Sequence, residues 1–296
     1  MEAVPSPESV STRRPPPSVI TRRVVVALDG GDAGLAALRW ALAALDAQRD
    51  VLRLLVVETP KVTRARVAAQ LQETTAQLPE DVLWWTRSAP DRAHPIGRAM
   101  VEHLRPTDLL VLGSDRPDRL DGLVDTSLPF YVAAVTRSPV VIVPREWQES
   151  DRVVLLVGEN EDSEAPLQLA AREAKRRGGE LRVVHAWQVA PGYPSRLAER
   201  SAGYEAARGE AHDILASRAA RLHELDPGLR ISERLVEGPR LAAVRPEVEG
   251  AGLAVVGRHG SGVFRDVVLG SLAHDLVGTL PCPLAVVPMV PARDAR

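Results

Sequence analysis

The stretch from Ala251 to Ser271, AGLAVVGRHGSGVFRDVVLGS, decides how the rest of the chain is interpreted. It begins with an apolar run, Leu253 to Val256, which is typical of a buried parallel strand. The run ends at Gly257, and a glycine-rich segment leads to Gly270-Ser271 and a second apolar segment, Leu272 to Leu280. Prolines follow directly, so this second segment is predicted to be a short helix.

A strand, a glycine loop and a helix start in this order favour an anion site. Glycines let backbone N–H groups approach a phosphate because no Cβ intervenes. The helix start adds unpaired N–H donors and the positive end of its dipole. Ser271 can cap that helix or bind a phosphate oxygen, and Arg258, His259 and Arg265 add basic groups. A turn that is rich in glycine for steric reasons alone stays open, because isolated glycine loops are weak signals.

Length and composition bound the class of protein. The 296 residues predict one large or two ordinary domains, and 45% hydrophobic residues suffice for real cores. Only 3% are aromatic, so the cores must consist of Ala, Val and Leu. The formal net charge of −2 gives no general attraction to nucleic acid or to acidic membranes. A single cysteine, Cys282, excludes an internal disulfide and is interpreted as a small core residue.

The N-terminus and the hydropathy pattern predict a soluble cytoplasmic protein. No apolar run is long enough to span a bilayer, and the first residues lack the apolar core of a secretory signal. Residues 1–21 are rich in Pro and Ser and have no hydrophobic period, which predicts a disordered tail.

Strand and helix patterns then alternate from residue 22 to residue 145. The predicted strands are Val24 to Leu28, Val51 to Val57, Val82 to Trp85, Asp108 to Leu112 and Val140 to Val143. The predicted helices are Ala33 to Ala47, Val62 to Leu78, Ile96 to Leu104 and Leu123 to Val135. This alternation predicts an α/β fold with a parallel sheet covered on both faces.

The pattern then repeats, which predicts two domains in tandem. Arg23-Val24-Val25 recurs as Arg152-Val153-Val154, at an offset of 129 residues, whereas Gly113 corresponds to Gly257 at an offset of 144. The second copy therefore holds a 15-residue insertion, expected between residues 188 and 227 as a loop and a helix from about 197 to 225. The predicted domains are 22–145 and 151–289, joined by a short polar segment.

The glycine spacing resembles the signature of the universal stress protein family. Gly257, two residues, Gly260, nine residues and Gly270-Ser271 match the pattern G-x2-G-x9-G-S/T, and the apolar flanks are similar too. The resemblance implies open parallel sheets of the adenine nucleotide alpha-hydrolase type with strand order 3-2-1-4-5. It also implies that the fifth strands, Val140 to Val143 and Leu284 to Val287, meet across a pseudo-twofold axis. One chain would then equal one family dimer, and a further homodimer stays open.

The resemblance implies ATP, with or without Mg²⁺, as the ligand. Gly257, Gly260, Gly270 and Ser271 would contact its phosphates and ribose, and His259, Ser261 and Gly262 would line the loop. Because ligands of open α/β sheets bind where the strand order reverses, the carboxyl ends of the first and fourth strands should form each site. The end of the second strand, at Val184, would lie beside the adenine. There His185 or Trp187 could stack on the base. For Trp187 the alternative, packing under the adjacent loop, is favoured.

The two predicted sites are unequal. In the first half Asp29 resembles the family's aspartate that contacts the nucleoside, but Arg116 and Thr126 replace glycines of the loop, and nearby aspartates would oppose a triphosphate. In the second half the loop is complete, but Gly158 replaces the aspartate. Whether Glu159, Asn160 or Asp162 substitutes for it stays open. ATP is therefore expected in the C-terminal domain.

Three functions follow in order of preference. The first is an ATP-binding regulatory module of the stress response with an unknown protein partner and with no nucleic-acid or membrane partner. The second is an interaction scaffold that has lost nucleotide binding and uses residues 188–228 as its surface. The third is a weak ATP hydrolase. The chain contains no Walker G-x4-G-K-S/T motif and no Ser-Gly-Gly-x-Asp-Ser loop, so it is not expected to be an enzyme beyond an incidental ATPase rate.

Overall fold

A computed structural model describes most of the chain from residue 22 onward. The described residues are 22–46, 49–60, 62–74, 83–88, 95–102, 104–115, 128–159, 163–188, 202–258, 271–277, 279 and 281–289. The expected disordered tail, residues 1–21, lies outside them. None of the helices in these ranges is long and apolar enough to cross a membrane.

Strands and helices alternate along the described residues. The strands are β1 (Arg22–Leu28), β2 (Asp50–Glu58), β3 (Leu83–Ser88), β4 (Leu109–Ser114), β5 (Val140–Pro144), β6 (Val153–Val157), β7 (Leu181–Trp187), β8 (Ile231–Glu237), β9 (Leu253–Arg258) and β10 (Leu284–Pro288). The helices are α1 (Asp32–Ala43), α2 (Arg64–Thr74), α3 (Pro95–Val101), α4 (Leu128–Val135), α5 (Ala165–Arg177), α7 (Ala202–Leu225), α8 (Arg240–Val248) and α9 (Ser271–Leu276).

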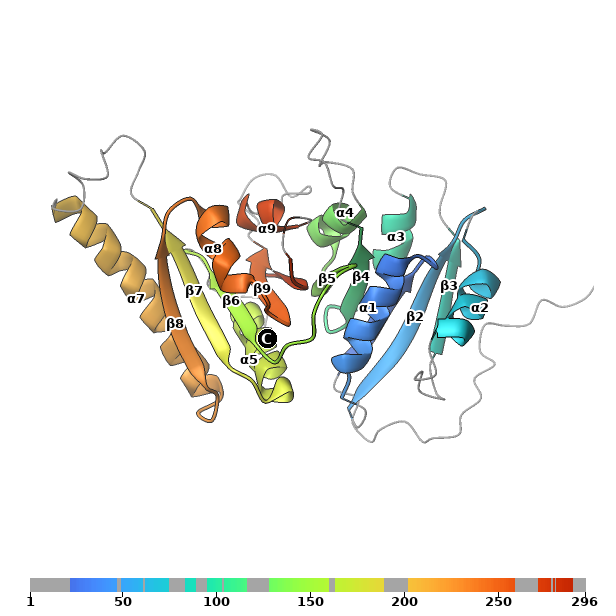
Figure 1. Ribbon diagram of the computed structural model, residues 1–296, viewed down its shortest axis with the longest axis horizontal. Helices are drawn as coiled ribbons and strands as arrows, with labels where there is room; N and C mark the ends of the chain where they lie inside the picture. The colour runs from blue at the N-terminus through green and yellow to red at the C-terminus, as the bar shows by residue number, and fades with distance from the viewer. Residues whose placement is uncertain are drawn as a thin grey trace, which may run out of the picture.

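The described strands form one continuous sheet in the order β3-β2-β1-β4-β5-β10-β9-β6-β7-β8 (Figure 1). Within β1–β5, and again within β6–β10, the order is 3-2-1-4-5 and the pairs are parallel. β5 and β10 pair antiparallel, with Ile142 opposite Leu284. The α/β fold class is confirmed, but the two expected sheets are joined into one. We call β1–β5 with their helices the first half and β6–β10 with theirs the second half.

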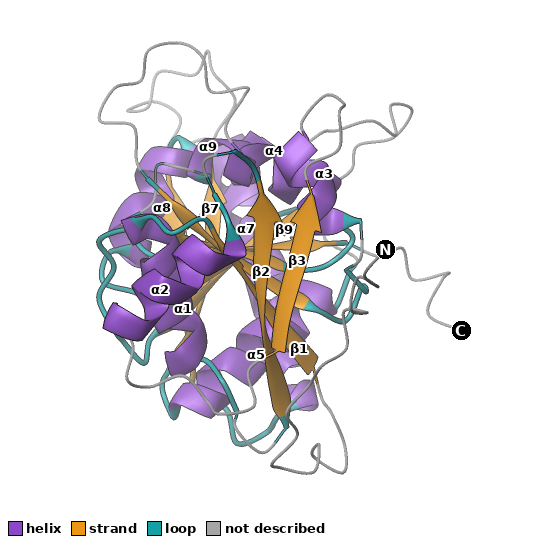
Figure 2. Cartoon of the chain, turned by 90° about the vertical axis from the view of Figure 1, so that its right-hand side faces the viewer, coloured by secondary structure: helices purple, strands orange, loops and turns teal. Residues whose placement is uncertain are grey.

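The helices cover both faces of this sheet, as Figure 2 shows. Successive strand residues point to opposite faces, so Val24 and Val26 pack on one side and Val25 and Ala27 on the other. The first face buries its side chains against α1, α2, α5 and α7, and the second against α3, α4, α8 and α9. Each of these two hydrophobic clusters contains residues of both halves, so the core is continuous across the junction.

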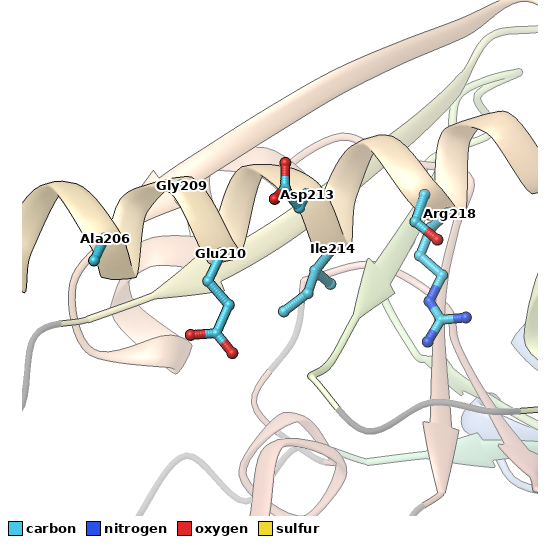
Figure 3. Close-up of a pocket in the computed structure, with 7 residues that line it drawn as sticks. Ala206, Gly209, Glu210, Asp213, Ile214 and Arg218 are labelled. Carbon is cyan, nitrogen blue, oxygen red and sulfur yellow. The ribbon is translucent and has the colours of Figure 1, made fainter.

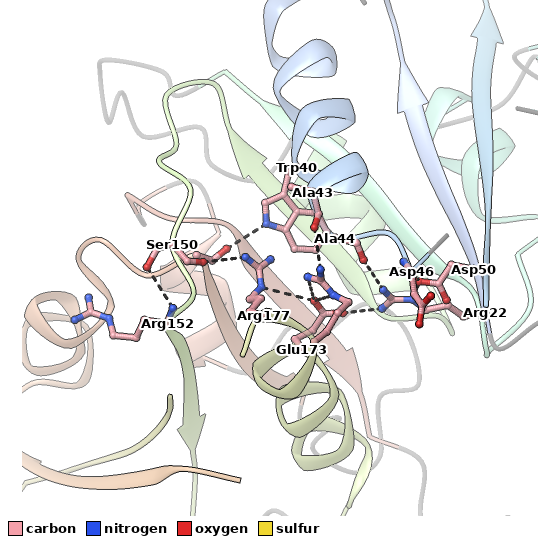
Figure 4. A network of polar contacts seen from close by, with 12 residues as sticks. Arg22, Trp40, Ala43, Ala44, Asp46, Asp50, Ser150, Arg152, Glu173 and Arg177 are labelled. Atoms are coloured by element: carbon pink, nitrogen blue, oxygen red, sulfur yellow. Dashed lines mark hydrogen bonds and ion pairs between the residues drawn. The ribbon is translucent and has the colours of Figure 1, made fainter. Parts of the chain in front are cut away.

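Buried polar contacts join the two halves across the junction (Figure 4). The Arg22 guanidinium lies 2.8 Å from the Glu173 carboxylate and 3.1 Å from that of Asp50. The indole N–H of Trp40 donates to the Gly252 carbonyl at 3.1 Å. Burial alone would raise the pKa of Glu173, but Arg22 and Arg176 outweigh it and hold that pKa below its usual value.

Helix α1 ends earlier than expected because arginines bind its last carbonyls. It ends at Ala43, whereas the hydrophobic period predicts continuation to Ala47. Arg176 donates to the Ala43 carbonyl at 2.8 Å, and Arg22 donates to the Ala44 carbonyl at 3.0 Å. Cations are favoured at a helix C-terminus, where carbonyls lack partners within the helix. This end is therefore set by a contact with the second half.

The segment between the halves is packed against them. The Trp147 indole N–H donates to the Ala36 carbonyl of α1 at 3.2 Å. A Cβ added to Gly179 would lie 2.0 Å from the Asp151 carbonyl oxygen, and one added to Gly252 would lie 2.0 Å from that of Ser150. Both positions therefore require glycine because the connecting backbone passes directly over them.

Candidate functional site

The strand order reverses at two places, between β1 and β4 and between β6 and β9. In open α/β sheets, ligands bind outside the carboxyl ends of the strands at such switch points. The first point is flanked by Asp29 and Ser114 and the second by Gly158 and Arg258, each at or just beyond the end of its strand. These two edges are the places to compare with the sequence prediction.

In the first half, Asp29 has a structural role in the turn before α1. Its carboxylate accepts a hydrogen bond from the Gly31 N–H at 2.8 Å. A Cβ at Gly34, in the first turn of α1, would lie 3.0 Å from the same carboxylate oxygen. Asp29 is exposed, so it also remains open to solvent at the sheet edge. The turn explains this aspartate without a ligand, and its predicted contact with a nucleoside stays a prediction.

Gly113 is explained by packing in the same way. A Cβ added there would lie 2.0 Å from the Ala33 carbonyl oxygen and 2.2 Å from its carbon, because the start of α1 lies directly on β4. Beside it, Arg145 and Asp32 form an ion pair at 2.5 Å, in which both side chains are more than half exposed. This ion pair was not predicted. The only indication in the sequence was that Arg145 directly follows a predicted strand and so lies at the sheet edge. The loop residues Arg116 and Thr126 lie outside the described residues.

In the second half, the two strands at the switch point have glycines at their ends. Leu156 of β6 pairs with Val256 of β9, so Gly158 and Gly257 lie near the ends of neighbouring strands. Gly158 is half-buried and Gly257 is buried, and neither glycine places a side chain beyond the strand ends. Glu159, a candidate substitute for the missing aspartate, pairs with Arg240 at 3.4 Å on the surface. This edge fits a ligand that is held mainly by backbone groups.

The sequence pattern predicted that Arg258 would add a positive charge to this space, but its side chain points elsewhere. Its guanidinium donates to the Ala133 carbonyl at 2.9 Å and to the Ala134 carbonyl at 2.5 Å, both in α4 of the first half. Burial lowers its pKa from the ordinary arginine value. The nearest described arginine of the expected phosphate loop is thus bound to the other half of the molecule.

The residues at the end of β7 are mostly buried. Val184 is 1% exposed and belongs to the apolar cluster under α8 and α9, so its side chain lies in the core. The His185 ring nitrogen Nδ1 lies 2.8 Å from the Val157 carbonyl oxygen. The Trp187 ring packs against Tyr204 of α7 with a centroid distance of 5.2 Å. These contacts favour packing of Trp187 over stacking on a base.

Most of the glycine loop lies outside the described residues. His259, Gly260, Ser261, Gly262 and Gly270 fall there, as do Asn160 and Asp162. Ser271 is the first residue of α9, as the predicted helix start requires, and that helix ends at Leu276 rather than Leu280. The role of the loop residues therefore stays a prediction.

One hollow lies away from these edges, and a second reaches the end of β4 at the first of them. One, of about 620 Å³, is lined by a single face of α7, where Glu210, Ile214 and Arg218 extend from the same side of the helix (Figure 3). The other, of about 650 Å³, lies between the halves and is lined by Asp115, Arg145 and Glu249, among others. The first hollow belongs to the helix of the predicted insertion.

Comparisons with known proteins agree with this fold. Residues 149–288 match the model of the universal stress protein family. Universal stress protein Rv2623 of Mycobacterium tuberculosis is 27% identical over 92% of this chain and 96% of its own length. A universal stress protein of Mycolicibacterium smegmatis is 25% identical over 78% of this chain and 79% of its own. A solved universal stress protein from Archaeoglobus fulgidus superposes with a TM-score of 0.57 at 15% identity, covering 91% of this chain and 97% of the other.

The strand order and its switch points define an open, doubly wound α/β protein. The family match covers the second half directly, and relatives of the same family align with most of the chain. The second half therefore belongs to the universal stress protein family, and the chain as a whole is similar to members of that family.

Proposed function

We propose that this protein is a nucleotide-binding regulatory module that holds one ATP at the carboxyl edge of the second half. The observation that carries the proposal is the switch point between β6 and β9, where both strands have glycines at their ends and the glycine-loop sequence follows directly. The phosphates would lie against the backbone of residues 257–271, with Ser271 at the start of α9. The adenine would lie toward the end of β7, near the backbone of Val184.

The first half is the weaker candidate for a nucleotide. Asp29 is engaged with the Gly31 N–H, and the glycine of β4 is required by the packing of α1. Asp32 and Asp115 lie after the ends of β1 and β4, where they would oppose phosphate charge. A regulatory role follows from binding without an assigned catalytic group; cytoplasmic location and an unidentified protein partner belong to the same proposal.

Nucleotide counting tests the proposal. The chain is purified under mild conditions and denatured, and the released adenine nucleotide is measured by chromatography. A separate folded sample, stripped of nucleotide, is titrated with Mg-ATP. We expect about one nucleotide per chain, from the single intact loop of the second half. Gly260→Val should abolish binding because a side chain blocks the backbone approach, whereas Asp29→Asn should leave it unchanged. No nucleotide released and none bound on titration would overturn the proposal.

An interaction scaffold is the second candidate, favoured by the hollow on α7. Its lining residues recur every three or four positions, so they form one continuous stripe of an exposed helix. Ala211, Leu215 and Leu222 form the opposite, buried stripe. If the chain binds no nucleotide, a partner captured by the parent and lost in Ile214→Arg would support this function.

A further inference from the structure

Arg258 links the end of β9 to the first half. It is the last residue of β9, and its Nη1 atom donates to two carbonyls of α4, those of Ala133 and Ala134, at 2.9 and 2.5 Å. Donor and acceptors are 124 and 125 residues apart in the chain. The contact therefore joins the two halves at a point directly before residue 259, where the glycine-loop sequence continues.

The contact is a helix cap supplied from the other half. α4 ends at Val135, so the Ala133 and Ala134 carbonyls belong to its last turn and lack partners within the helix. A cation there is also favoured by the negative end of the helix dipole. A guanidinium has several donors in a fixed plane and can bind both carbonyls at once. Arg258 is thus held in one place by the geometry of α4.

The end of α4 is itself fixed within the first half. The Ser138 hydroxyl donates to the Arg105 carbonyl at 2.7 Å, and the Ser138 N–H donates to the Thr136 hydroxyl at 3.1 Å. Ser138 is fully buried, and the Arg105 N–H in turn donates to the Asp108 carboxylate at 2.8 Å. Arg258 is therefore attached to a rigid part of the first half rather than to a surface loop.

The surrounding packing places this link beside the proposed site. α4 and α9 lie side by side over the middle of the sheet in both views (Figures 1 and 2). Val132 of α4 and Leu276 of α9 belong to the same buried cluster as Val256 of β9. The first half thus contacts the strand that precedes the glycine loop and shares a buried cluster with the helix that follows it.

We propose that Arg258 is a positioning residue: by capping α4 it fixes the end of β9 and makes nucleotide affinity in the second half depend on the first half. The inference rests on the proposed function, since it concerns the same site. It gives the first half a task that needs no nucleotide of its own. A bound nucleotide would, by reciprocity, also stabilise the end of α4.

The test compares Mg-ATP affinity in the parent, Arg258→Ala, Arg258→Gln and Arg258→Lys by titration calorimetry. We expect about tenfold weaker binding for alanine and glutamine, because two charge-assisted hydrogen bonds that hold the strand end are lost. Lysine keeps the cation and should recover part of the affinity. Arg240→Ala is the matched control: it also removes a positive charge from this edge, but its partner is the exposed Glu159 and it does not reach α4.

Hydrogen exchange gives a second measurement. The effect of ATP on exchange in α4 would not depend on Arg258 if this residue only stabilised the fold. In the parent, ATP should slow exchange of amides at the end of α4, including the Thr136 N–H, which donates to the Val132 carbonyl at 3.0 Å. In Arg258→Ala this response should disappear even under saturating ATP. Unchanged affinity and an unchanged response in all three Arg258 variants would overturn the inference while leaving the proposed function intact. A parent that binds no Mg-ATP would instead overturn the proposed function.

Discussion

Glu173 is the residue on which the buried polar contact between the halves depends. Its side chain is fully buried and lies 2.8 Å from both Arg22 and Arg176, with Arg177 at 3.9 Å. Removing one partner of a buried ion pair is costly because the remaining charges stay desolvated. The carboxylate must therefore remain ionised for this interface to keep its structure.

We expect Glu173→Gln to lower the free energy of unfolding at pH 7 by about 3 kcal/mol, because three buried or partly buried guanidinium groups lose the Glu173 charge and only Arg22 keeps an ion pair, with Asp50. Since the arginines hold the folded-state pKa below the unfolded value of about 4.3, the stabilisation is present above that pH and is lost as pH falls through the folded-state pKa. Urea titrations between pH 7 and pH 3 should show the two proteins converge in acid. The exposed Glu205→Gln is the control; a parallel, pH-independent offset would contradict this account.

Alanine substitutions distinguish a glycine that packing requires from one that has free space around it. Gly113→Ala places a Cβ 2.0 Å from the Ala33 carbonyl oxygen, so we expect a loss of about 1–3 kcal/mol in stability. Gly209→Ala lies on the exposed side of α7 with nothing within 4 Å and should gain about 0.5–1 kcal/mol from helix propensity. Thermal and urea unfolding measure both. A neutral Gly113→Ala would remove the packing explanation and restore a ligand as the reason for this glycine.

At the scale of elements, α1 is a helix that contacts the other half through a buried side chain. Trp40 is fully buried, donates to the Gly252 carbonyl and lies under the Arg177 guanidinium, 5.6 Å from the ring centroid. Trp40→Phe keeps an aromatic ring but leaves that carbonyl without its donor, which should cost about 1–3 kcal/mol. Trp147→Phe removes a comparable bond from a half-buried indole and should cost less, by the same urea measurement. Equal losses would show that burial of the bond does not matter here.

The elements that the sequence predicted are those with an apolar period of their own. β1, β4, β5, β9 and β10 consist almost wholly of buried apolar residues, and their positions agree with the prediction to within two residues. β8 has no such pattern because it is an edge strand with exposed Glu233 and Arg234, and the sequence analysis does not locate it. The end of α1 is bound by Arg176, which lies 133 residues away along the chain. No local pattern encodes such contacts.

The candidate site likewise has features that could be predicted from the sequence and features that depend on contacts with distant residues. The proposed place of the site follows from the strand order, which the family resemblance implied and the repeated β/α pattern alone did not. The direction of Arg258 does not, because an arginine after a strand can face a phosphate or a neighbouring helix, and only the antiparallel contact of β5 with β10 brings α4 within reach. Trp187 was an ambiguous case for a similar reason: its partner, Tyr204, lies on the helix of the insertion.

At the scale of the whole molecule, the two halves share one sheet and one pair of cores. β5 and β10 would each become an unpaired edge if the halves separated, and the contact between Arg22 and Glu173 would be exposed to water or left unpaired. Unfolding one half alone would therefore destroy interactions that stabilise the other. Such coupling favours a single cooperative transition even in a chain that carries two repeats of one pattern.

We therefore expect the full chain to unfold in one step, and substitutions in either half to shift the same midpoint. Gly113→Ala in the first half and Glu173→Gln in the second should each move the whole urea transition, monitored by circular dichroism and by tryptophan fluorescence, without splitting it. Both Trp40 and Trp187 report on the transition, one from each half. If Gly113→Ala produced two transitions, with only the first half lost early, the halves would be independent. The contact of Arg258 with α4 would then add little to the stability of the second half, because that half would stay folded without it.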